Sequence, residues 1–484
     1  MLDNSKNGIA SGLFWKFGER FFAQGVSFAV SIVLARVLTP QDFGLVAMVM
    51  IFITFADVFV VSGFSTALIQ NKNATDDDFS TMYYCSLCFS CILYVILSFI
   101  SPIVASFYNE PALVDILRLF SLRIPLSAYN SIQHAYVSRN MLFKKFFFST
   151  LVGTIISGIV GVFFAYHGFG PYALIAQYFT NTIIDTIVLA FTIPWRIKLV
   201  FSKESAKSMM KYGWKVLAAD FSGTFFTQLR SLIVGKFFSS VDLAYYNRGA
   251  QFPDLIETNL SVSIMSVLFP ALSNKSDNNS EIKKLLRSAV RIMSFCLAPL
   301  FIGLIIIAKP LVLILYTDKW SESIPFVQII SMTALIAIVG SISLQALKAV
   351  GRSDVLLKIE FIKKPLYLIL LILGVKINVT AVALSMLIYT IYSSIVNMWQ
   401  LKKYLGYSLG EQCYDVFSNL LLSLIMSIII YPLQFLLGNY VILVIAQITV
   451  GGLLYLGVAH ITRNKAYLYL MDRVKYMLKK GGGS

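Results

Sequence analysis

Long apolar runs, each about 20 residues long, recur along the whole chain and are separated by short polar breaks. That length is what an α-helix needs to cross the roughly 30 Å hydrocarbon core of a bilayer. The pattern predicts an all-α polytopic membrane protein with about fourteen spans. The predicted spans are residues 13–36, 43–68, 82–107, 112–138, 145–166, 170–194, 214–238, 244–272, 287–308, 324–348, 355–375, 379–401, 416–437 and 440–461.

The polar residues of the first span follow a helical spacing. Lys16, Arg20, Gln24, Ser27 and Ser31 are three or four positions apart, so they share one face of a helix whose other faces are apolar. A polar stripe of this kind is expected to face a water-filled cavity or the interior of a helix bundle rather than lipid.

A degenerate copy of the first two spans lies 200 positions later in the chain. The matched pairs are Arg36 with Lys236, Thr39 with Ser239, Asp42 with Asp242, and Asp57 with Glu257. Six helices separate equivalent elements, so the two halves should run in the same direction and form two six-helix lobes in a V around a central cavity. A repeat could also be structural duplication without a functional role.

The repeat sets the expected domain organisation. We expect an N-lobe, a cytoplasmic linker, a C-lobe, a further helix pair, a basic cytoplasmic tail and a short tag-like end, at residues 1–195, 196–213, 214–403, 404–464, 465–480 and 481–484. The basic tail carries interleaved aromatic and aliphatic residues, which suits either an amphipathic helix on the inner leaflet or a loose segment. No cleaved signal peptide is expected at the N-terminus.

Composition supports the membrane class. The 484 residues are 57% hydrophobic and 13% charged, with a mean hydropathy of +0.76, which excludes an ordinary soluble domain. The net charge of +16 is explained by basic cytoplasmic loops rather than by nucleic-acid binding. With both termini cytoplasmic, the outer loops would hold only Lys309, Lys319 and Lys376, and the other loop lysines and arginines would lie inside.

Several charged residues fall inside the predicted spans. At mid-bilayer each would cost roughly 2.5–3.5 kcal/mol if it faced lipid, so these side chains must either pair with carboxylates or line a wet cavity. Guanidinium groups match phosphate oxygens well, so a cavity rich in cations suits an anionic ligand. The candidate cavity cations are Lys16, Arg20, Arg118, Arg123, Arg230 and Arg248. The candidate pairing or ion-coupling acids are Glu19, Asp57, Asp220, Asp254 and Glu257.

The sequence lacks the motifs of common enzymes. It has no glycine-rich phosphate loop, no H-E-x-x-H motif and no paired-carboxylate site, so we expect neither an enzyme nor a bound cofactor. Cys85, Cys88 and Cys91 have a spacing that suggests a metal site, but no His or acidic residue is near them, and small hydrophobic filler is the favoured interpretation. Lone histidines such as His134 are mostly structural.

Four segments resemble one family. LARVLTPQDFG at 34–44, ALIQ at 67–70, YVSRNMLF at 136–143 and GFGPYAL at 168–174 are similar to the polysaccharide flippases of the O-antigen and teichuronic-acid export type. These are Wzx-like members of the multidrug/oligosaccharidyl-lipid/polysaccharide exporter superfamily.

The resemblance implies a bacterial inner-membrane protein that moves undecaprenyl-pyrophosphate-linked oligosaccharide to the outer leaflet by alternating access. It also implies that Arg20 and Arg248 hold the pyrophosphate, and that the last two helices form a groove for the lipid tail. Implied partners are the lipid-linked oligosaccharide, membrane lipids, H⁺ or Na⁺ as coupling ion and a polysaccharide polymerase, with a monomeric transporter.

Two alternatives belong to the same superfamily, namely a cation-coupled multidrug exporter and a lipid II flippase. A drug exporter should have an acidic cavity, whereas the first lobe here is basic. A membrane polymerase or ligase would need a large outer loop, and the chain has none.

The charge distribution gives a testable topology. In intact cells, an impermeant maleimide should label Lys376→Cys in an outer loop. It should label Lys403→Cys, in an inner loop, only after the membrane is permeabilised. Labelling of Lys403→Cys in intact cells would contradict the predicted orientation.

Overall fold

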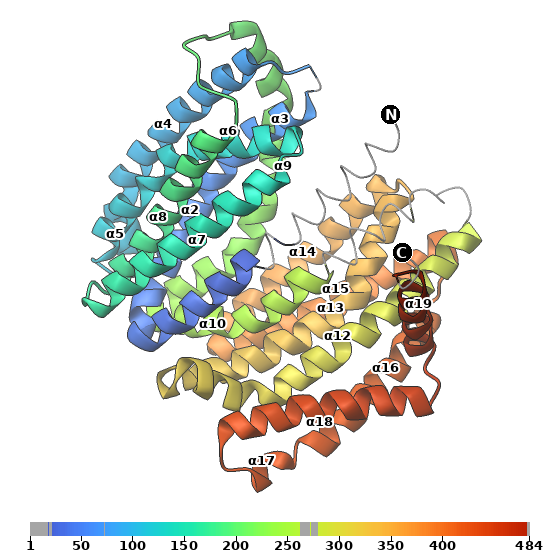
Figure 1. Ribbon diagram of the computed structural model, residues 1–484. Helices are drawn as coiled ribbons and strands as arrows, with labels where there is room; N and C mark the ends of the chain where they lie inside the picture. The colour runs from blue at the N-terminus through green and yellow to red at the C-terminus, as the bar shows by residue number, and fades with distance from the viewer. Residues whose placement is uncertain (1–17, 19–21, 72, 262–271, 273–278, 482–484) are drawn as a thin grey trace. The chain divides into compact units, whose positions relative to one another are not determined.

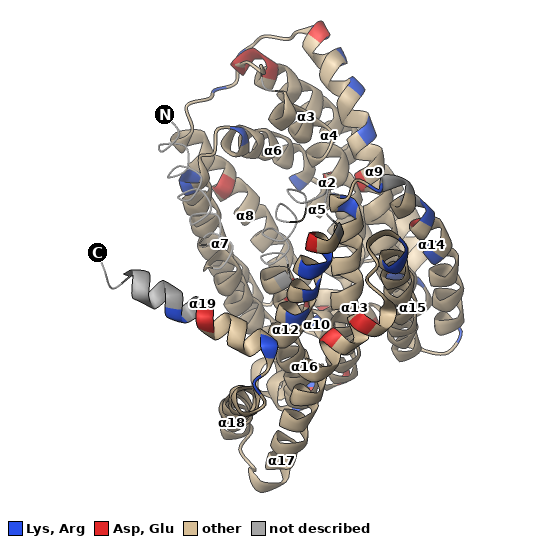
Figure 2. Ribbon diagram, turned by 90° about the vertical axis from the view of Figure 1, so that its right-hand side faces the viewer, with Lys and Arg blue, Asp and Glu red and all other residues tan. Residues whose placement is uncertain are grey.

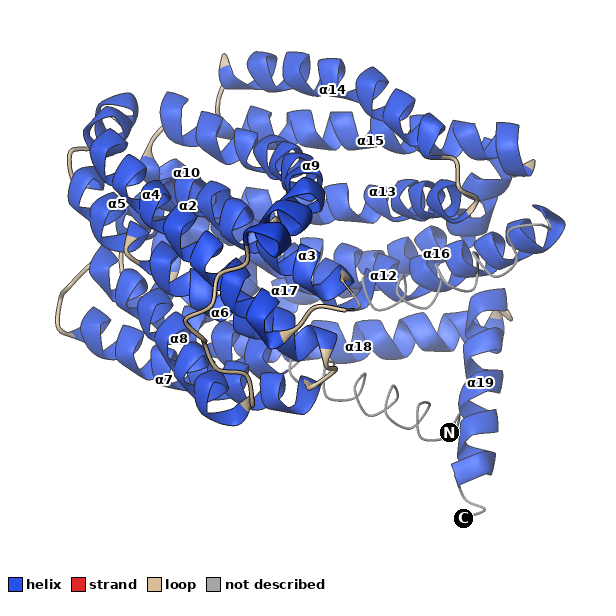
Figure 3. Cartoon of the chain, turned by 90° about the horizontal axis from the view of Figure 1, so that it is seen from above, coloured by secondary structure: helices blue, strands red, loops and turns tan. Residues whose placement is uncertain are grey.

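A computed structural model describes residues 18, 22–71, 73–261, 272 and 279–481. The described residues form helices joined by short loops, with no β-strand among them (Figures 1 and 3). The chain divides into two compact units, unit 1 at Met1–Ala244 and unit 2 at Tyr245–Ser484. The boundary falls inside one helix, α10 (Ser240–Ile256).

Unit 1 contains a short apolar helix followed by eight labelled helices. They are Phe22–Val37, α2 (Pro40–Val61), α3 (Phe64–Gln70), α4 (Asp76–Tyr108), α5 (Leu113–Ser121), α6 (Arg123–Arg139), α7 (Phe143–Tyr166), α8 (Pro171–Thr192) and α9 (Lys203–Phe237). Within this unit α7 packs along α8, and α4 lies beside α5 and α6.

Unit 2 begins in α10, which contains Pro253 and ends in a turn of π-helix, η1 (Glu257–Ser261). The other elements are α12 (Asn279–Tyr316), the 3₁₀ helix η2 (Asp318–Ser323), α13 (Ile324–Ala349), α14 (Ser353–Val375), α15 (Val379–Leu405), α16 (Leu409–Ile430), α17 (Leu433–Leu436), α18 (Tyr440–Ile461) and α19 (Lys465–Gly481). In this unit α12 packs against α13, α16 and α18.

The predicted class, an all-α polytopic membrane protein, is confirmed. Nine helical stretches among the described residues are long and apolar enough to cross a membrane. Helix α18 contains no Lys, Arg, Asp or Glu, and it is tan in Figure 2. The predicted number of fourteen spans stays a prediction, because several of the remaining helices, such as α9, carry more charge.

Two element boundaries differ from the sequence prediction. The predicted span 112–138 is broken into α5 and α6 at Leu122. Pro125 explains the break, because its ring prevents an uninterrupted helical hydrogen-bond ladder through this point. Helix α9 already starts at Lys203, inside the segment expected to be a linker, where the Ser202 side chain caps it by accepting from the Ser205 amide at 3.2 Å.

The sequence repeat corresponds to repeated helix caps. At the start of α2, the Thr39 amide donates to Asp42 Oδ2 at 2.9 Å and the Asp42 amide donates to Thr39 Oγ1 at 3.2 Å. At the start of α10, Ser239 and Asp242 make the same two bonds at 3.1 and 3.0 Å. This reciprocal capping box satisfies backbone donors that would otherwise be left open.

Helices α2 and α9 lie in direct contact within unit 1. The Phe221 ring of α9 lies 5.6 Å from the Phe55 ring and 5.2 Å from the Phe59 ring, centroid to centroid. Near Gly63 the backbones come closer still, because a Cβ atom on Gly213 would lie 2.3 Å from the Gly63 carbonyl oxygen. The close approach requires a residue without a side chain at position 213.

We therefore expect Gly213→Ala to destabilise unit 1 by about 1–3 kcal/mol, because the methyl group has no room beside the Gly63 backbone. Gly223→Ala is the matched control on the same helix, since a Cβ there meets nothing within 4 Å. The control should be neutral or slightly stabilising. Melting temperatures of the purified variants in detergent measure both effects, and equal melting temperatures would refute the close contact.

Candidate functional site

The clearest charged pair inside the helices of unit 1 joins Asp57 of α2 to Arg123 at the start of α6. Arg123 Nη2 donates to Asp57 Oδ2, and the Arg123 guanidinium lies 5.8 Å from the centre of the Phe120 ring. Asp57 Oδ1 and Arg123 Nε are buried and have no hydrogen-bond partner among the described residues. The pair therefore has one acceptor atom and one donor atom that could each form a further hydrogen bond.

Two further candidate cations in the described part of unit 1 lie on other helices. Arg118 is exposed on α5, where its Nε lies 3.4 Å from the Ser98 carbonyl oxygen. Arg230 is half-buried on α9. On the same helix, Lys236 donates to the Phe107 carbonyl oxygen and lies 4.6 Å from the centre of the Phe107 ring.

In unit 2, Arg248 is buried in a cage of aromatic rings. Its side chain belongs to α10 and is only 7% exposed. The guanidinium lies 5.1 Å from the centre of the Tyr316 ring and 5.2 Å from that of Trp320. It donates to Gln251 Oε1 at 2.5 Å, and the Tyr316 hydroxyl donates to the same oxygen at 2.9 Å. The cage fixes the orientation of a cation inside the helical part of the chain.

The candidate acids differ in their surroundings. Asp57 binds the candidate cation Arg123, while Asp220 on α9 and Asp254 on α10 are exposed. Glu257 is exposed at the first position of the π-helical turn. Lys16, Glu19 and Arg20 lie outside the described residues. The structure thus brings together Asp57 and Arg123. The functional roles of all the candidate cations and acids stay predictions.

Two polar clusters were not among the candidate sites. In unit 1, Asp185 Oδ2 accepts from Asn130 Nδ2 at 2.8 Å and lies 2.7 Å from His134 Nε2. The i, i+3, i+4 spacing of Asn130, Gln133 and His134 on α6 is a sequence signal that could have indicated this polar face. Gln133 Nε2 also donates to the Thr186 carbonyl oxygen at 3.1 Å, which ties α6 to α8.

The second cluster lies in unit 2, between α12 and α16. The Asp415 side chain is fully buried and accepts from Arg287 at 2.8 Å, from Arg291 at 2.6 Å and from the Tyr407 hydroxyl at 2.8 Å. The two arginines lie one helical turn apart on α12, but neither they nor Asp415 lie in a motif that would have indicated the pairing from the sequence. In the loop before α16, burial and the bond to Asp415 raise the pKa of Tyr407, so this phenol stays protonated.

Within the described ranges, no three His, Cys, Asp or Glu side chains could hold a metal ion. Cys85 is half-buried on α4, and Cys88 and Cys91 are exposed there as free thiols.

The fold is shared with solved transporters. The lipid II flippase MurJ in its inward closed conformation matches with a TM-score of 0.75 at 18% identity, covering 92% of this chain and 98% of that one. An inward-facing multidrug MATE transporter of the MOP superfamily matches with a TM-score of 0.62 at 15% identity, over 79% and 94% of the two chains. The chain therefore has the fold of the exporter superfamily named from its sequence motifs.

The chain belongs to the polysaccharide biosynthesis protein family, which matches residues 33–325. It is 21% identical over 342 residues to the succinoglycan biosynthesis transport protein ExoT of Rhizobium meliloti, covering 71% of this chain and 69% of that one. It is 24% identical over 437 residues to the lipopolysaccharide biosynthesis protein WzxC of Escherichia coli, covering 87% of each. The resemblance to polysaccharide flippases and the assignment to a non-enzyme class are confirmed.

The Asp57–Arg123 pair can be tested by a double-mutant cycle. Asp57→Ala and Arg123→Ala should each lower the free energy of unfolding by about 1–3 kcal/mol, and the double variant by less than the sum, because each single change leaves a half-buried charge without its counterion. Arg118→Ala should change it by no more than about 0.5 kcal/mol, since this side chain is exposed. Strict additivity in denaturant or thermal unfolding would argue against the pair.

Proposed function

We propose that this protein moves undecaprenyl-pyrophosphate-linked oligosaccharide from the inner to the outer leaflet of the bacterial cytoplasmic membrane, by alternating access, during cell-surface polysaccharide synthesis. Family membership supports the polysaccharide role. The related proteins named for succinoglycan, lipopolysaccharide and teichuronic acid synthesis support a role in moving chains that differ in sugar. Both termini would be cytoplasmic, as the loop charges predict.

The observation that carries the proposal is the placement of guanidinium groups inside the helical part of both units. Arg123 lies in α6, Arg230 in α9 and Arg248 in α10, and each is buried or half-buried. Such groups facing lipid would each cost roughly 2.5–3.5 kcal/mol at mid-bilayer. A diphosphate headgroup offers them charge-assisted, bidentate hydrogen bonds. Arg20 and Arg248 would hold the diphosphate, with Lys16, Arg118, Arg123 and Arg230 lining its route.

The headgroup would cross while the polyprenyl tail stays in the bilayer. With the cell interior negative, outward movement of about two negative charges gains roughly 4.6 kcal/mol per 100 mV of membrane potential. If transport is coupled to H⁺ or Na⁺, the ion would bind at a carboxylate. The candidate carboxylates are Glu19, Asp57, Asp220, Asp254 and Glu257. The transporter would act as a monomer and deliver its cargo to a polysaccharide polymerase.

A lipid II flippase is the second candidate function, favoured by the fold similarity to MurJ. Its cargo is also a lipid-linked diphosphate sugar, so the same cations would serve it. A multidrug exporter is disfavoured, because cationic drugs would meet a basic set of side chains.

Arg20→Ala combined with Arg248→Ala should abolish export, because the diphosphate loses its bidentate donors. Arg248→Lys should retain part of the activity, since a lysine keeps the charge and loses the planar fork. Lys376→Ala, in an exposed loop, is the control and should export normally. The measurement is a pulse of radiolabelled lipid-linked intermediate in a deletion strain, with immunoblots to confirm membrane insertion.

Accumulation of the oligosaccharide intermediate on the inner leaflet would support the proposed cargo, and accumulation of lipid II would support the second candidate. Normal export by the Arg20→Ala, Arg248→Ala variant would refute the diphosphate-binding role.

A further inference from the structure

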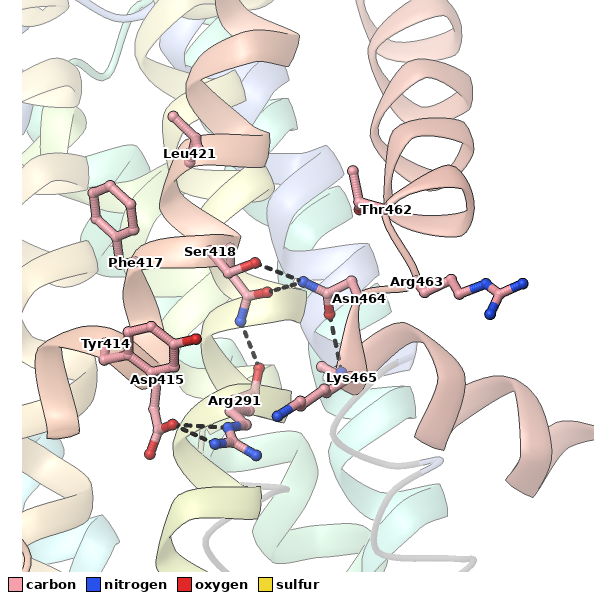
Figure 4. Close-up of a pocket in the computed structure, with 12 residues that line it drawn as sticks. Arg291, Tyr414, Asp415, Phe417, Ser418, Leu421, Thr462, Arg463, Asn464 and Lys465 are labelled. Atoms are coloured by element: carbon pink, nitrogen blue, oxygen red, sulfur yellow. Dashed lines mark hydrogen bonds and ion pairs between the residues drawn. The ribbon is translucent and has the colours of Figure 1, made fainter.

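A pocket of about 360 Å³ lies in unit 2, where α12, α16 and the turn between α18 and α19 meet. Figure 4 shows Lys465 extending across this pocket toward Arg291, while Arg463 projects outward from its rim. These elements are the predicted cytoplasmic ends of α12, α16 and α18, so the pocket would open at the inner surface of the membrane.

The floor of the pocket is rigid. Asn464 is buried and donates to Asn419 Oδ1 at 2.9 Å and to Ser418 Oγ at 3.2 Å. Its own Oδ1 accepts from the Ala466 amide at 2.9 Å and so caps α19. Asn419 in turn donates to the Arg291 carbonyl oxygen at 2.9 Å. A ligand here would find polar groups that are already fixed in place.

The pocket has an excess of positive charge. Its lining includes the cations Arg291, Arg463 and Lys465 and a single acid, Asp415. Asp415 is already shared between Arg291 and Arg287. Within the described parts of the chain, Arg463 and Lys465 make no ion pair. The pocket therefore lacks an anion to balance its lysine and arginine side chains.

One wall of the pocket continues into an apolar, outward-facing stripe of α16. Tyr414 and Phe417 line the pocket, and Leu421, Leu424 and Ile428 extend the same helical face at three- and four-residue spacing. These five side chains are 46% to 70% exposed in the folded chain. In a membrane such a stripe contacts acyl chains. A cationic pocket and an acyl-chain surface thus adjoin on one helix.

We propose that this pocket binds the phosphate headgroup of an anionic phospholipid from the inner leaflet. Lys465 and Arg291 would donate to the phosphate oxygens, Arg463 would add charge at the rim, and the acyl chains would lie along the exposed stripe of α16. The bound lipid would hold α19 against the membrane surface beside α18. The site is built from α12, α16 and the turn between α18 and α19, and it does not include Arg20 or Arg248, the residues proposed to hold the transported diphosphate.

The test uses the full-length protein in nanodiscs of phosphatidylcholine with increasing phosphatidylglycerol, and native mass spectrometry counts the retained lipids. Wild type should retain phosphatidylglycerol in preference to phosphatidylcholine. Arg463→Gln combined with Lys465→Gln should weaken retention about thirtyfold, because each of the two basic groups near an anionic lipid contributes roughly 1 kcal/mol. Lys402→Gln combined with Lys403→Gln removes the same charge from an exposed site at the end of α15 and should change it less than twofold.

Melting temperatures in pure phosphatidylcholine control for misfolding. Both double variants alter exposed side chains, so each should have the same melting temperature as the wild type. Equal loss of phosphatidylglycerol in both double variants would overturn the proposal in favour of general surface charge. Displacement of the lipid by millimolar inorganic phosphate would overturn it in favour of a free-anion site. Oligosaccharide export is read separately, so failure of the lipid site leaves the proposed transport function intact.

Discussion

A charge at the depth of the hydrocarbon core must find either a counterpart or a water-filled cavity within the protein, because lipid cannot solvate it. The membrane helices of this chain meet that constraint in several ways. Asp57 and Arg123 form a direct pair between α2 and α6. Lys363 of α14, only 3% exposed, lies 2.8 Å from Glu360 and 3.3 Å from Asn397 Oδ1. Arg248 is held between two aromatic rings and an amide oxygen. The positions of these helices are therefore fixed by polar contacts as well as by apolar packing.

The same constraint explains what could be predicted from the sequence. The thickness of the bilayer sets the length of each apolar run, and the orientation of the chain sets the charge of each loop. The helical class and most element positions therefore follow from the sequence. The sequence also indicated that charges such as Arg123 need a carboxylate or a cavity, and Asp57 was among the acids proposed. The choice between those two outcomes depends on which helices touch, and the spacing of residues along one helix does not contain that information.

Other features could not be predicted because they depend on tertiary contacts. The buried Asp415 is separated from Arg287 by more than a hundred residues, and neither position has a motif around it. The aromatic cage of Arg248 forms only because Tyr316 of α12 and Trp320 of η2 pack against α10 in the folded chain. Conversely, part of the sequence repeat has a local explanation, since Thr39 with Asp42 and Ser239 with Asp242 are helix caps. Likeness between the two halves at those positions reflects how a helix must begin.

The sharing of Asp415 between two arginines has a consequence for the evolution of chain length. A helix pair at the end of a transporter looks removable, because a bundle could close without it. Here a chain that stopped before Leu409 would leave Arg287 and Arg291 without the carboxylate that they share. Loss of the last two membrane helices therefore becomes easier in a descendant that has already replaced both arginines.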